Sequence, residues 1–353
     1  MNHPLQAAPP TTGGVERLRA VRRASMRRPR RALILLALGV LAALAVRVLL
    51  GTYTVTIPDF LTLLTGGEVP VRGARFIVME DKLPRALLGA LAGCAFGCAG
   101  AIFQLLLRNP LASPDIIGIS NGASLGAVIS MVYWGASGFS VSVYAILFAL
   151  AAALVTMILA SGRANVGNRF ILMGIGVAAL CQAAVTYLLE RMSTGQATSA
   201  TVWMVGSLNN ANWERIRILS IALIVLLPFI LWGVNHLKTS AVGDDLAHGL
   251  GVPVGCVRWY YISLGVLLAA MATAATGPIA FIAFVSGPIA RRMMGGRHTL
   301  LGASMVGATI VVLADFMAAN LFPSISFPVG ILTGAMGAPV LIWLLLQNQK
   351  EGK

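Results

Sequence analysis

The sequence predicts an all-α membrane protein that crosses the bilayer about ten times. Of its 353 residues, 58% are hydrophobic and only 11% are charged, whereas soluble domains carry roughly 25% charged residues. Apolar stretches recur along the chain at about the 20-residue length that a helix needs to cross the hydrocarbon core. Most Lys and Arg residues fall in alternate segments between these stretches, as the positive-inside rule requires.

The predicted spans follow one another with short polar connections. They lie near residues 32–50, 84–107, 114–134, 139–161, 169–189, 215–235, 257–276, 278–294, 299–319 and 329–347. The eighth span is short and flanked by glycine and proline, so nine spans remain an alternative to ten. Interior prolines such as Pro228, Pro278 and Pro288 are acceptable because neighbouring helices can satisfy the carbonyls that proline frees. The spans form one membrane domain over residues 29–349.

The net charge of +14 is concentrated before the first span, where eight arginines lie between Arg17 and Arg31. This pattern predicts a disordered basic tail over residues 1–28 on the cytoplasmic side. We expect the tail to orient the chain and to contact anionic membrane lipid, not nucleic acid. No cleavable signal peptide is expected, because the apolar run begins only at residue 32 and leads into further spans.

Motifs for catalysis and metal binding are absent from the sequence. No Gly-x-x-x-x-Gly-Lys-Ser/Thr loop occurs, so the chain cannot bind ATP phosphates through that motif. The histidines lie outside the spans without ligand spacing, and Cys94 and Cys98 fit close helix packing better than a metal pair. The chain is therefore predicted to be a conduit and not an enzyme, with no metal site and no cofactor of its own.

The second span carries small residues on one face. Gly89, Gly93 and Gly97 recur every fourth residue, which allows another backbone to approach closely. Tight helix packing is the preferred interpretation, and a substrate path along this face is the alternative. Gln104, at the inner end of the same span, can bond across helices.

Asp315 lies well inside the ninth predicted span. A carboxylate within the membrane is costly and usually functional. Two readings stay open. Asp315 is the proton site of an ion-coupled secondary transporter, or it is a structural acceptor for neighbouring polar groups.

The connection between spans six and seven contains an acidic, apolar segment over residues 242–251. Asp244 or Asp245 can cap a short helix there. Leu246, Ala247 and Leu250 would then share one face. Membrane-surface helices favour basic polar faces, whereas this one is acidic, so we favour a helix that fills a groove on a partner protein.

These features together resemble the FecCD-type permease subunits of iron-siderophore, haem and cobalamin ABC importers. The resemblance covers about residues 30–347 and rests on several motifs in order. They are Lys82-Leu-Pro-Arg85, Gly100-Ala-Ile-Phe-Gln104, Arg108-Asn-Pro-Leu-Ala-Ser-Pro114, Gly118-Ile-Ser-Asn-Gly-Ala123, Gly243-Asp-Asp-Leu-Ala247, Gly277-Pro-Ile-Ala-Phe281, Ile289-Ala-Arg-Arg292, Ala314-Asp315 and Pro328-Val-Gly330.

The resemblance implies the type II ABC importer permease fold, multi-pass in the bacterial cytoplasmic membrane with both termini cytoplasmic. It implies a second permease subunit (a paralogue or a second copy), two ATP-binding subunits that hold ATP and Mg, and an extracytoplasmic substrate-binding protein. The cargo would be a ferric siderophore moved by alternating access, with haem or cobalamin as alternatives.

The resemblance also implies roles for individual residues. Gly243, Asp244, Asp245, Leu246, Ala247, Leu250 and Gly251 would form the coupling element that sits on the ATPase. Lys82 and Arg85 would dock the binding protein. Val166, Gly167 and Asn168 would lie at the cytoplasmic gate, and spans five and ten would line the path. Gly89, Gly93, Gly97, Gln104, Asn109 and Asp315 would pack helices or border the path.

Three departures from the family pattern stand out. Pro288 replaces the usual histidine in Gly287-Pro-Ile-Ala-Arg291, Asn320 replaces a basic residue, and Ser326-Phe327 replaces an acidic one. These changes resemble the more divergent partner of a heterodimeric permease. The Trp203 to Asn209 stretch and the Gly243-Asp-Asp run look closest to the ferric-enterobactin type.

Overall fold

The structure, a computed structural model, describes residues 12–71, 73–161, 166–321 and 327–351, and every regular element in these ranges is helical. The α-helices are α1 (Thr12–Leu49), α2 (Ile57–Leu64), α3 (Ala74–Phe76), α4 (Leu83–Leu106), α5 (Ile119–Trp134), α6 (Phe139–Ala160), α7 (Val166–Glu190), α8 (Thr194–Val205), α9 (Trp213–Trp232), α10 (Val234–Ser240), α11 (Asp244–Gly249), α12 (Val254–Thr276), α13 (Ile282–Met293), α14 (Leu300–Asn320) and α15 (Val329–Glu351). A π-helical segment, η1 (Ile77–Lys82), and a 3-10 turn, η2 (Pro114–Ile117), precede α4 and α5.

Each of the ten predicted spans contains one of these helices. By length and composition, seven helices of the described chain can cross a membrane, namely Pro29–Leu49, Ala74–Leu106, Phe139–Ala160, Arg169–Glu190, Trp213–Trp232, Val254–Thr276 and Leu300–Asn320. The other three predicted spans hold α5, α13 and α15. The all-α, polytopic fold predicted from the sequence is confirmed.

The eighth predicted span is shorter in the structure than in the sequence-based prediction. The prediction begins it at residue 278, whereas α13 begins at Ile282 and has 12 residues. Gly277 at φ +74° and Phe281 at φ +67° have positive φ angles, which a right-handed helix cannot include.

The first helix is longer than predicted. The sequence predicts disorder over residues 1–28, but α1 begins at Thr12 and continues without a break through Pro29 to Leu49. Six of residues 12–28 are arginines, and Leu18, Ala20, Ala24 and Met26 are further strong helix formers. An apolar helix that follows directly can extend backward through such residues, so high charge alone did not imply disorder.

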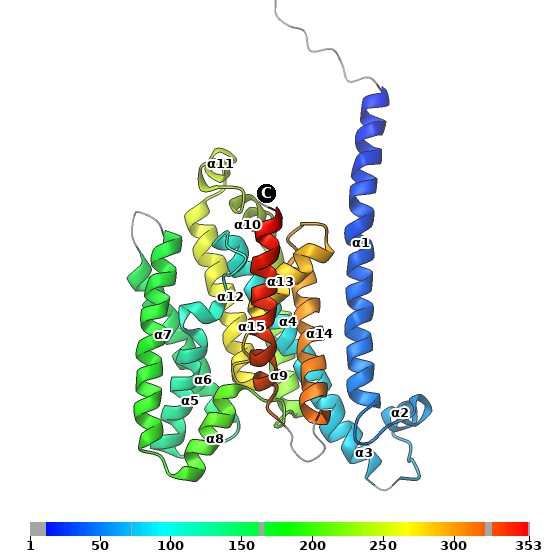
Figure 1. Cartoon of the computed structure of the whole chain (residues 1–353), viewed down its shortest axis with the longest axis vertical. Helices are drawn as coiled ribbons and strands as arrows, with labels where there is room; N and C mark the ends of the chain where they lie inside the picture. Colours follow the sequence, from blue (N-terminus) through cyan, green and yellow to red (C-terminus); the bar gives the residue numbers. More distant parts are fainter. Residues whose placement is uncertain (1–11, 72, 162–165, 322–326, 352–353) are drawn as a thin grey trace, which may run out of the picture.

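The helices stand side by side, with α1 at one edge of the molecule and α7 at the opposite edge (Figure 1). Helix α11, the C-terminus and the start of α1 lie at one end, whereas α2, α3 and α8 lie at the other. Helix α4 is the central element, and it packs against α14, α12 and α13. Most of its side chains are buried.

The predicted glycine face of α4 packs against α14. A side chain at Gly93 would strike the backbone of Gly307, and one at Gly97 would strike the backbone of Ala303. Gly89 is different, because its nearest neighbours are the side chains of Leu208 and Val311. The small residues at Gly93 and Gly97 thus permit backbone contact between two helices.

Candidate functional site

The short acidic helix predicted over residues 242–251 is α11, and it protrudes at the end of the molecule that holds the C-terminus (Figure 1). Gly243 precedes it at φ +145°, a conformation that side chains rarely adopt. Gly251 follows it at φ +79°. Glycines on both sides therefore allow the chain to turn sharply into and out of α11.

The faces of α11 differ from the predicted arrangement. Ala247 is completely buried and packs with Val252 and Val254, so it faces the protein. Leu246 and Leu250 are exposed. The prediction that Leu246, Ala247 and Leu250 share one face was wrong, because Ala247 packs against the chain that follows α11. The two exposed leucines leave an apolar surface at the tip of the molecule.

Asp244 ties α11 to two other elements, instead of capping the helix with its side chain. Its carboxylate accepts a hydrogen bond from Arg258 Nη2 of α12 at 2.9 Å and a second from Arg108 Nη2. Burial raises its pKa, but the hydrogen bonds and charges of Arg258 and Arg108 outweigh burial and hold the pKa below its ordinary value. Asp245, next along the helix, forms no ion pair with any residue that the structure describes.

Arg108 belongs to the turn that follows α4. Its backbone adopts φ +49°, which is uncommon for a residue other than glycine. Its guanidinium also donates to the carbonyl of Ser240 at 2.8 Å and 3.2 Å. Asn109 shapes the same turn by accepting a hydrogen bond from the Leu111 N–H at 2.9 Å. The central helix α4 is thus joined directly to the base of α11.

Asp315 lies between two arginines at the other end of α4. Its Oδ2 accepts a hydrogen bond from Arg47 Nε at 2.6 Å, and its Oδ1 accepts one from Arg85 Nη2 at 2.9 Å. All three side chains are buried. The geometry favours the structural reading of Asp315, because each carboxylate oxygen is held by a guanidinium.

Lys82 and Arg85 do not lie on the surface. Lys82 is buried, and its Nζ donates to the carbonyls of Val48, Leu50 and Tyr53. It thereby satisfies carbonyls left free at the C-terminus of α1. With Arg85 held by Asp315, neither cation of the predicted docking pair is available to an acidic partner in this conformation. Their docking role stays a prediction.

Gln104 contacts α13. Its Nε2 donates to the carbonyl of Phe284 at 3.0 Å. That carbonyl has no intrahelical donor, because the residue four positions on is Pro288, which lacks an N–H. The amide of Gln104 therefore replaces the hydrogen bond that Pro288 removes, as the sequence-based expectation of a bond across helices requires.

The predicted gate residues Val166, Gly167 and Asn168 form the first turn of α7. Their side chains, like residues 162–165, fall outside the described part of the structure. Their role stays a prediction.

A cavity of about 550 Å³ opens between η2, α5, α7, α8 and α13. Gln182 of α7, from the fifth predicted span, and Gly330 of α15, from the tenth, border it. The role of these spans in lining a path stays a prediction. The polar lining of the cavity includes Asp115, whose carboxylate accepts hydrogen bonds from Ser113 and Ser120. Sequence reasoning did not single out Asp115, although an acid just after Pro114 at the start of a predicted span was a visible signal.

Comparison of the chain with known proteins identifies its family. The model of the FecCD transport family matches residues 35–347. The chain is 37% identical over 286 residues to the ferric enterobactin transport system permease protein FepG of Escherichia coli (strain K12), covering 81% of this chain and 86% of that protein. It is 32% identical over 323 residues to the Fe(3+)-citrate import system permease protein YfmE of Bacillus subtilis (strain 168), covering 90% and 96%.

A solved structure supports the same assignment. A metal-chelate type ABC transporter in an inward-facing conformation superposes with a TM-score of 0.78 at 25% identity, covering 90% of this chain and 99% of that one. The fold is therefore that of an ABC importer permease, a multi-pass transport subunit of the inner membrane whose ATPase is a separate chain. The chain belongs to the FecCD transport family.

Proposed function

We propose that this chain is one half of the membrane path of an importer that carries a ferric siderophore into the cytoplasm. The complete importer contains a second permease subunit (a paralogue, in view of the departures at Pro288 and Asn320), two ATP-binding subunits and an extracytoplasmic substrate-binding protein. ATP and Mg²⁺ belong to the ATP-binding subunits. Both termini and α11 face the cytoplasm, and the cargo passes by alternating access.

The observation that carries the proposal is the way α11 is presented. Leu246 and Leu250 are exposed at the tip of the molecule, and Ala247 on the opposite face packs against Val252 and Val254. Amphipathic helices of this kind fill grooves on partner proteins. Asp244 connects α11 through Arg108 to the turn that follows the central helix α4. A displacement of α11 is therefore transmitted to α4.

The cargo class is supported by the relatives. One of the similar proteins described above is named for ferric enterobactin and the other for ferric citrate. Relatives named for hemin (Yersinia pestis) and vitamin B12 (Salmonella newport) are also similar, at 34% and 30% identity. A ferric siderophore is therefore the first cargo to test, and haem and cobalamin follow.

The ion-coupled alternative based on Asp315 has no support in the geometry. A proton carrier needs access to solvent and a carboxylate that can release its partners, whereas Asp315 is buried between Arg47 and Arg85. A neutral Asp315 would leave the buried Arg47 without a counter-ion and Arg85 with only the half-exposed Asp81 at 3.6 Å.

The proposal is tested with the double substitution Leu246→Glu and Leu250→Glu in the full chain. We expect the protein to insert normally, to lose the ATP-binding subunit on co-purification, and to lose ATP-dependent uptake of radiolabelled ferric siderophore into vesicles. Met293→Glu, an exposed apolar position on α13 outside α11, is the matched control and should keep both. Uptake that persists without ATP, or ATPase retention in the double variant, would contradict the proposal.

A further inference from the structure

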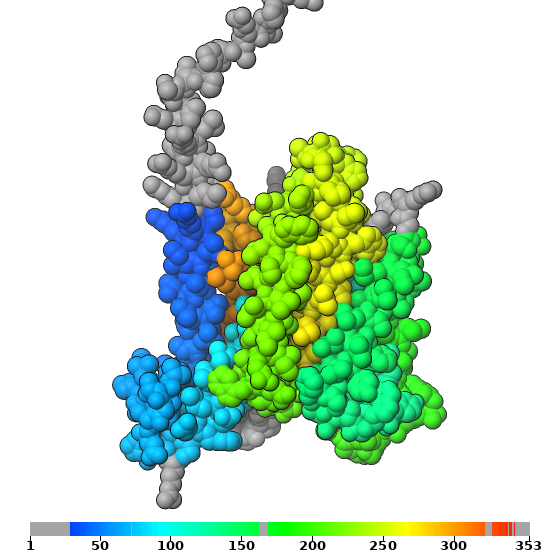
Figure 2. Space-filling model, turned by 180° about the vertical axis from the view of Figure 1, so that it is seen from behind, coloured from blue at the N-terminus to red at the C-terminus, as the bar shows by residue number. Residues whose placement is uncertain are grey.

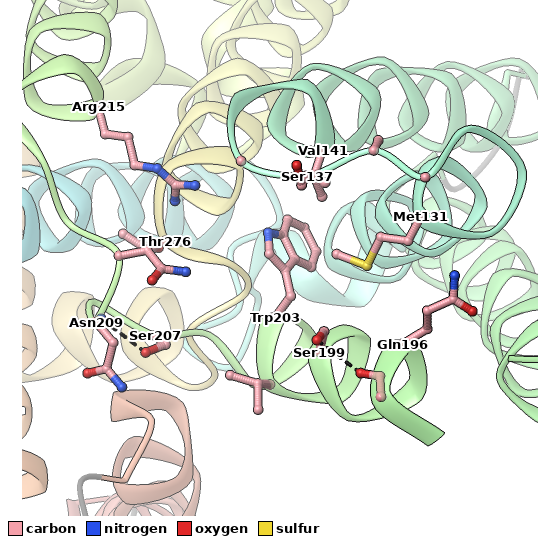
Figure 3. A pocket seen from close by; sticks show the side chains of 16 residues that line it. Met131, Ser137, Val141, Gln196, Ser199, Trp203, Ser207, Asn209, Arg215 and Thr276 are labelled. Atoms are coloured by element: carbon pink, nitrogen blue, oxygen red, sulfur yellow. Dashed lines mark hydrogen bonds between the residues drawn. The ribbon is translucent and has the colours of Figure 1, made fainter. Parts of the chain in front are cut away.

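A second cavity of about 550 Å³ lies at the end of the molecule opposite α11, beside α8 and the start of α9 (Figure 3). Amide and hydroxyl side chains line it, among them Gln196, Ser199 and Asn209, together with the indole of Trp203. The guanidinium of Arg215 points into this space. None of these groups belongs to α11 or lines the cavity that contains Asp115.

Arg215 is half-buried, and it has no counter-ion among the residues that the structure describes. Its guanidinium donates one hydrogen bond, from Nη1 to the carbonyl of Ala275 at 2.8 Å. The adjacent Glu214 is exposed and forms no ion pair with it. Removing a cation from water without pairing it costs free energy, so the cavity offers a place for a negative charge.

On its other side, Arg215 borders a shallow apolar groove of about 30 Å³ between α6, α9 and α12. Phe139, Ile146, Leu219 and Met271 are among its lining residues. Ser142, which also lines it, donates its hydroxyl to the carbonyl of Ala274 at 2.6 Å. The groove therefore offers hydrocarbon contact and no free hydroxyl.

The groove belongs to a surface that faces the membrane. Figure 2 shows α9 beside α6, with α12 between them, on the face opposite that of Figure 1. Large apolar side chains such as Leu147 of α6 and Ile224 of α9 are exposed there. Trp213 opens α9 two residues before Arg215, and tryptophan is typical of the level of the lipid head groups.

We propose that Arg215 binds the phosphate of an anionic phospholipid of the outer leaflet. The head group occupies the outer cavity, where Asn209 and Gln196 can bond its hydroxyl groups. One acyl chain passes over the shallow groove and along the exposed apolar side chains of α6 and α9. The assignment to a lipid, and not to a free anion, follows from the apolar groove that adjoins the same guanidinium.

The test uses the full chain purified in mild detergent and supplied with phosphatidylglycerol or phosphatidylcholine. Native mass spectrometry counts the lipid retained. We expect Arg215→Gln to lower phosphatidylglycerol retention roughly tenfold or more, as for a lost charge-assisted hydrogen bond. Arg217→Gln is the matched control, because Arg217 is exposed and lines neither space. It should leave retention unchanged.

A second variant probes the groove without touching the charge. Ile146→Trp narrows the groove and should also lower phosphatidylglycerol retention, in a protein that keeps its thermal stability in detergent. Equal retention in the wild type and Arg215→Gln would overturn the proposal. So would stabilisation of the wild type by millimolar inorganic phosphate to the same extent as by phosphatidylglycerol, because the site would then take a free anion. These measurements need no partner subunit, so their failure is distinct from failure of the proposed import function.

Discussion

Two clusters of the same composition, one aspartate between two arginines, lie at opposite ends of α4. At the N-terminal end of α4, the outer end in the proposed orientation, Asp315 joins Arg47 and Arg85, and its side chain is 2% exposed. At the C-terminal end, the inner end in that orientation, Asp244 joins Arg108 and Arg258, and its side chain is 44% exposed. The same Asp–Arg ion pairs are therefore buried in the outer cluster and exposed to solvent in the inner cluster.

The difference in exposure assigns different roles to the two clusters. A buried ion pair is costly to break, because removing one partner leaves an uncompensated charge. A solvent-exposed pair contributes little and can exchange partners with water. The outer cluster thus fixes α1, α4 and α14 to one another, whereas the inner cluster connects α4, α11 and α12 by contacts that can rearrange during a transport cycle.

The largest expected effect comes from removing the outer carboxylate. Asp315→Asn leaves Arg47 buried without a counter-ion and leaves Arg85 with only the half-exposed Asp81 at 3.6 Å, and it should destabilise the protein by about 3–5 kcal/mol. Thermal unfolding in detergent and abundance in the membrane measure this loss. Asp81→Asn is the control, because Asp81 reaches Arg85 only at 3.6 Å and is half-exposed. Equal melting temperatures for Asp315→Asn and the wild type would remove the contrast between the clusters.

A substitution in the inner cluster should change the coupling of ATP hydrolysis to import, and it should leave the free energy of unfolding almost unchanged. Asp244→Asn removes the ion pairs to Arg108 and Arg258 and should change stability by no more than about 1 kcal/mol. It should raise the ATP hydrolysed for each molecule imported, because α11 is no longer tied to α4. Asp245→Asn, one residue on, should leave that ratio unchanged. If the two variants give the same ratio in reconstituted vesicles, Asp244 has no coupling role.

The smallest expected effect is a pH dependence confined to the inner cluster. The pKa of Asp244 lies below the ordinary value of about 3.9 in the folded protein. The ion pairs therefore stabilise α11 above about pH 4, and this contribution is lost as the pH falls through the folded-state pKa.

Hydrogen-exchange protection of the α11 amides, corrected for intrinsic rates, is the measurement for this pH effect. Protection should hold from pH 7 to about pH 4 and fall below it, and it should be low throughout in Asp244→Asn. Loss of protection already near neutral pH would mean that another group controls α11.

The sequence predicted the features that depend on neighbouring residues. The spans followed from apolar length, the contact of Gly93 and Gly97 from their four-residue spacing, and α11 from its acidic start. The partners of Lys82 and Arg85 depend on tertiary structure, because 230 positions separate Arg85 from Asp315. Their burial could therefore not be predicted. The inward face of Ala247 was missed because six residues carry too little periodicity to orient a helix.

Gln104 and Pro288 have a consequence for how this chain can vary. Pro288 frees a carbonyl in an apolar surrounding, and the amide of Gln104 is what satisfies it. A residue with a backbone N–H at position 288 could bond the Phe284 carbonyl itself and would release Gln104 from this duty. An apolar residue at position 104 alone would leave the Phe284 carbonyl without a hydrogen-bond donor. The two positions are therefore coupled in this chain, and a variant without the proline at position 288 should tolerate an apolar residue at position 104.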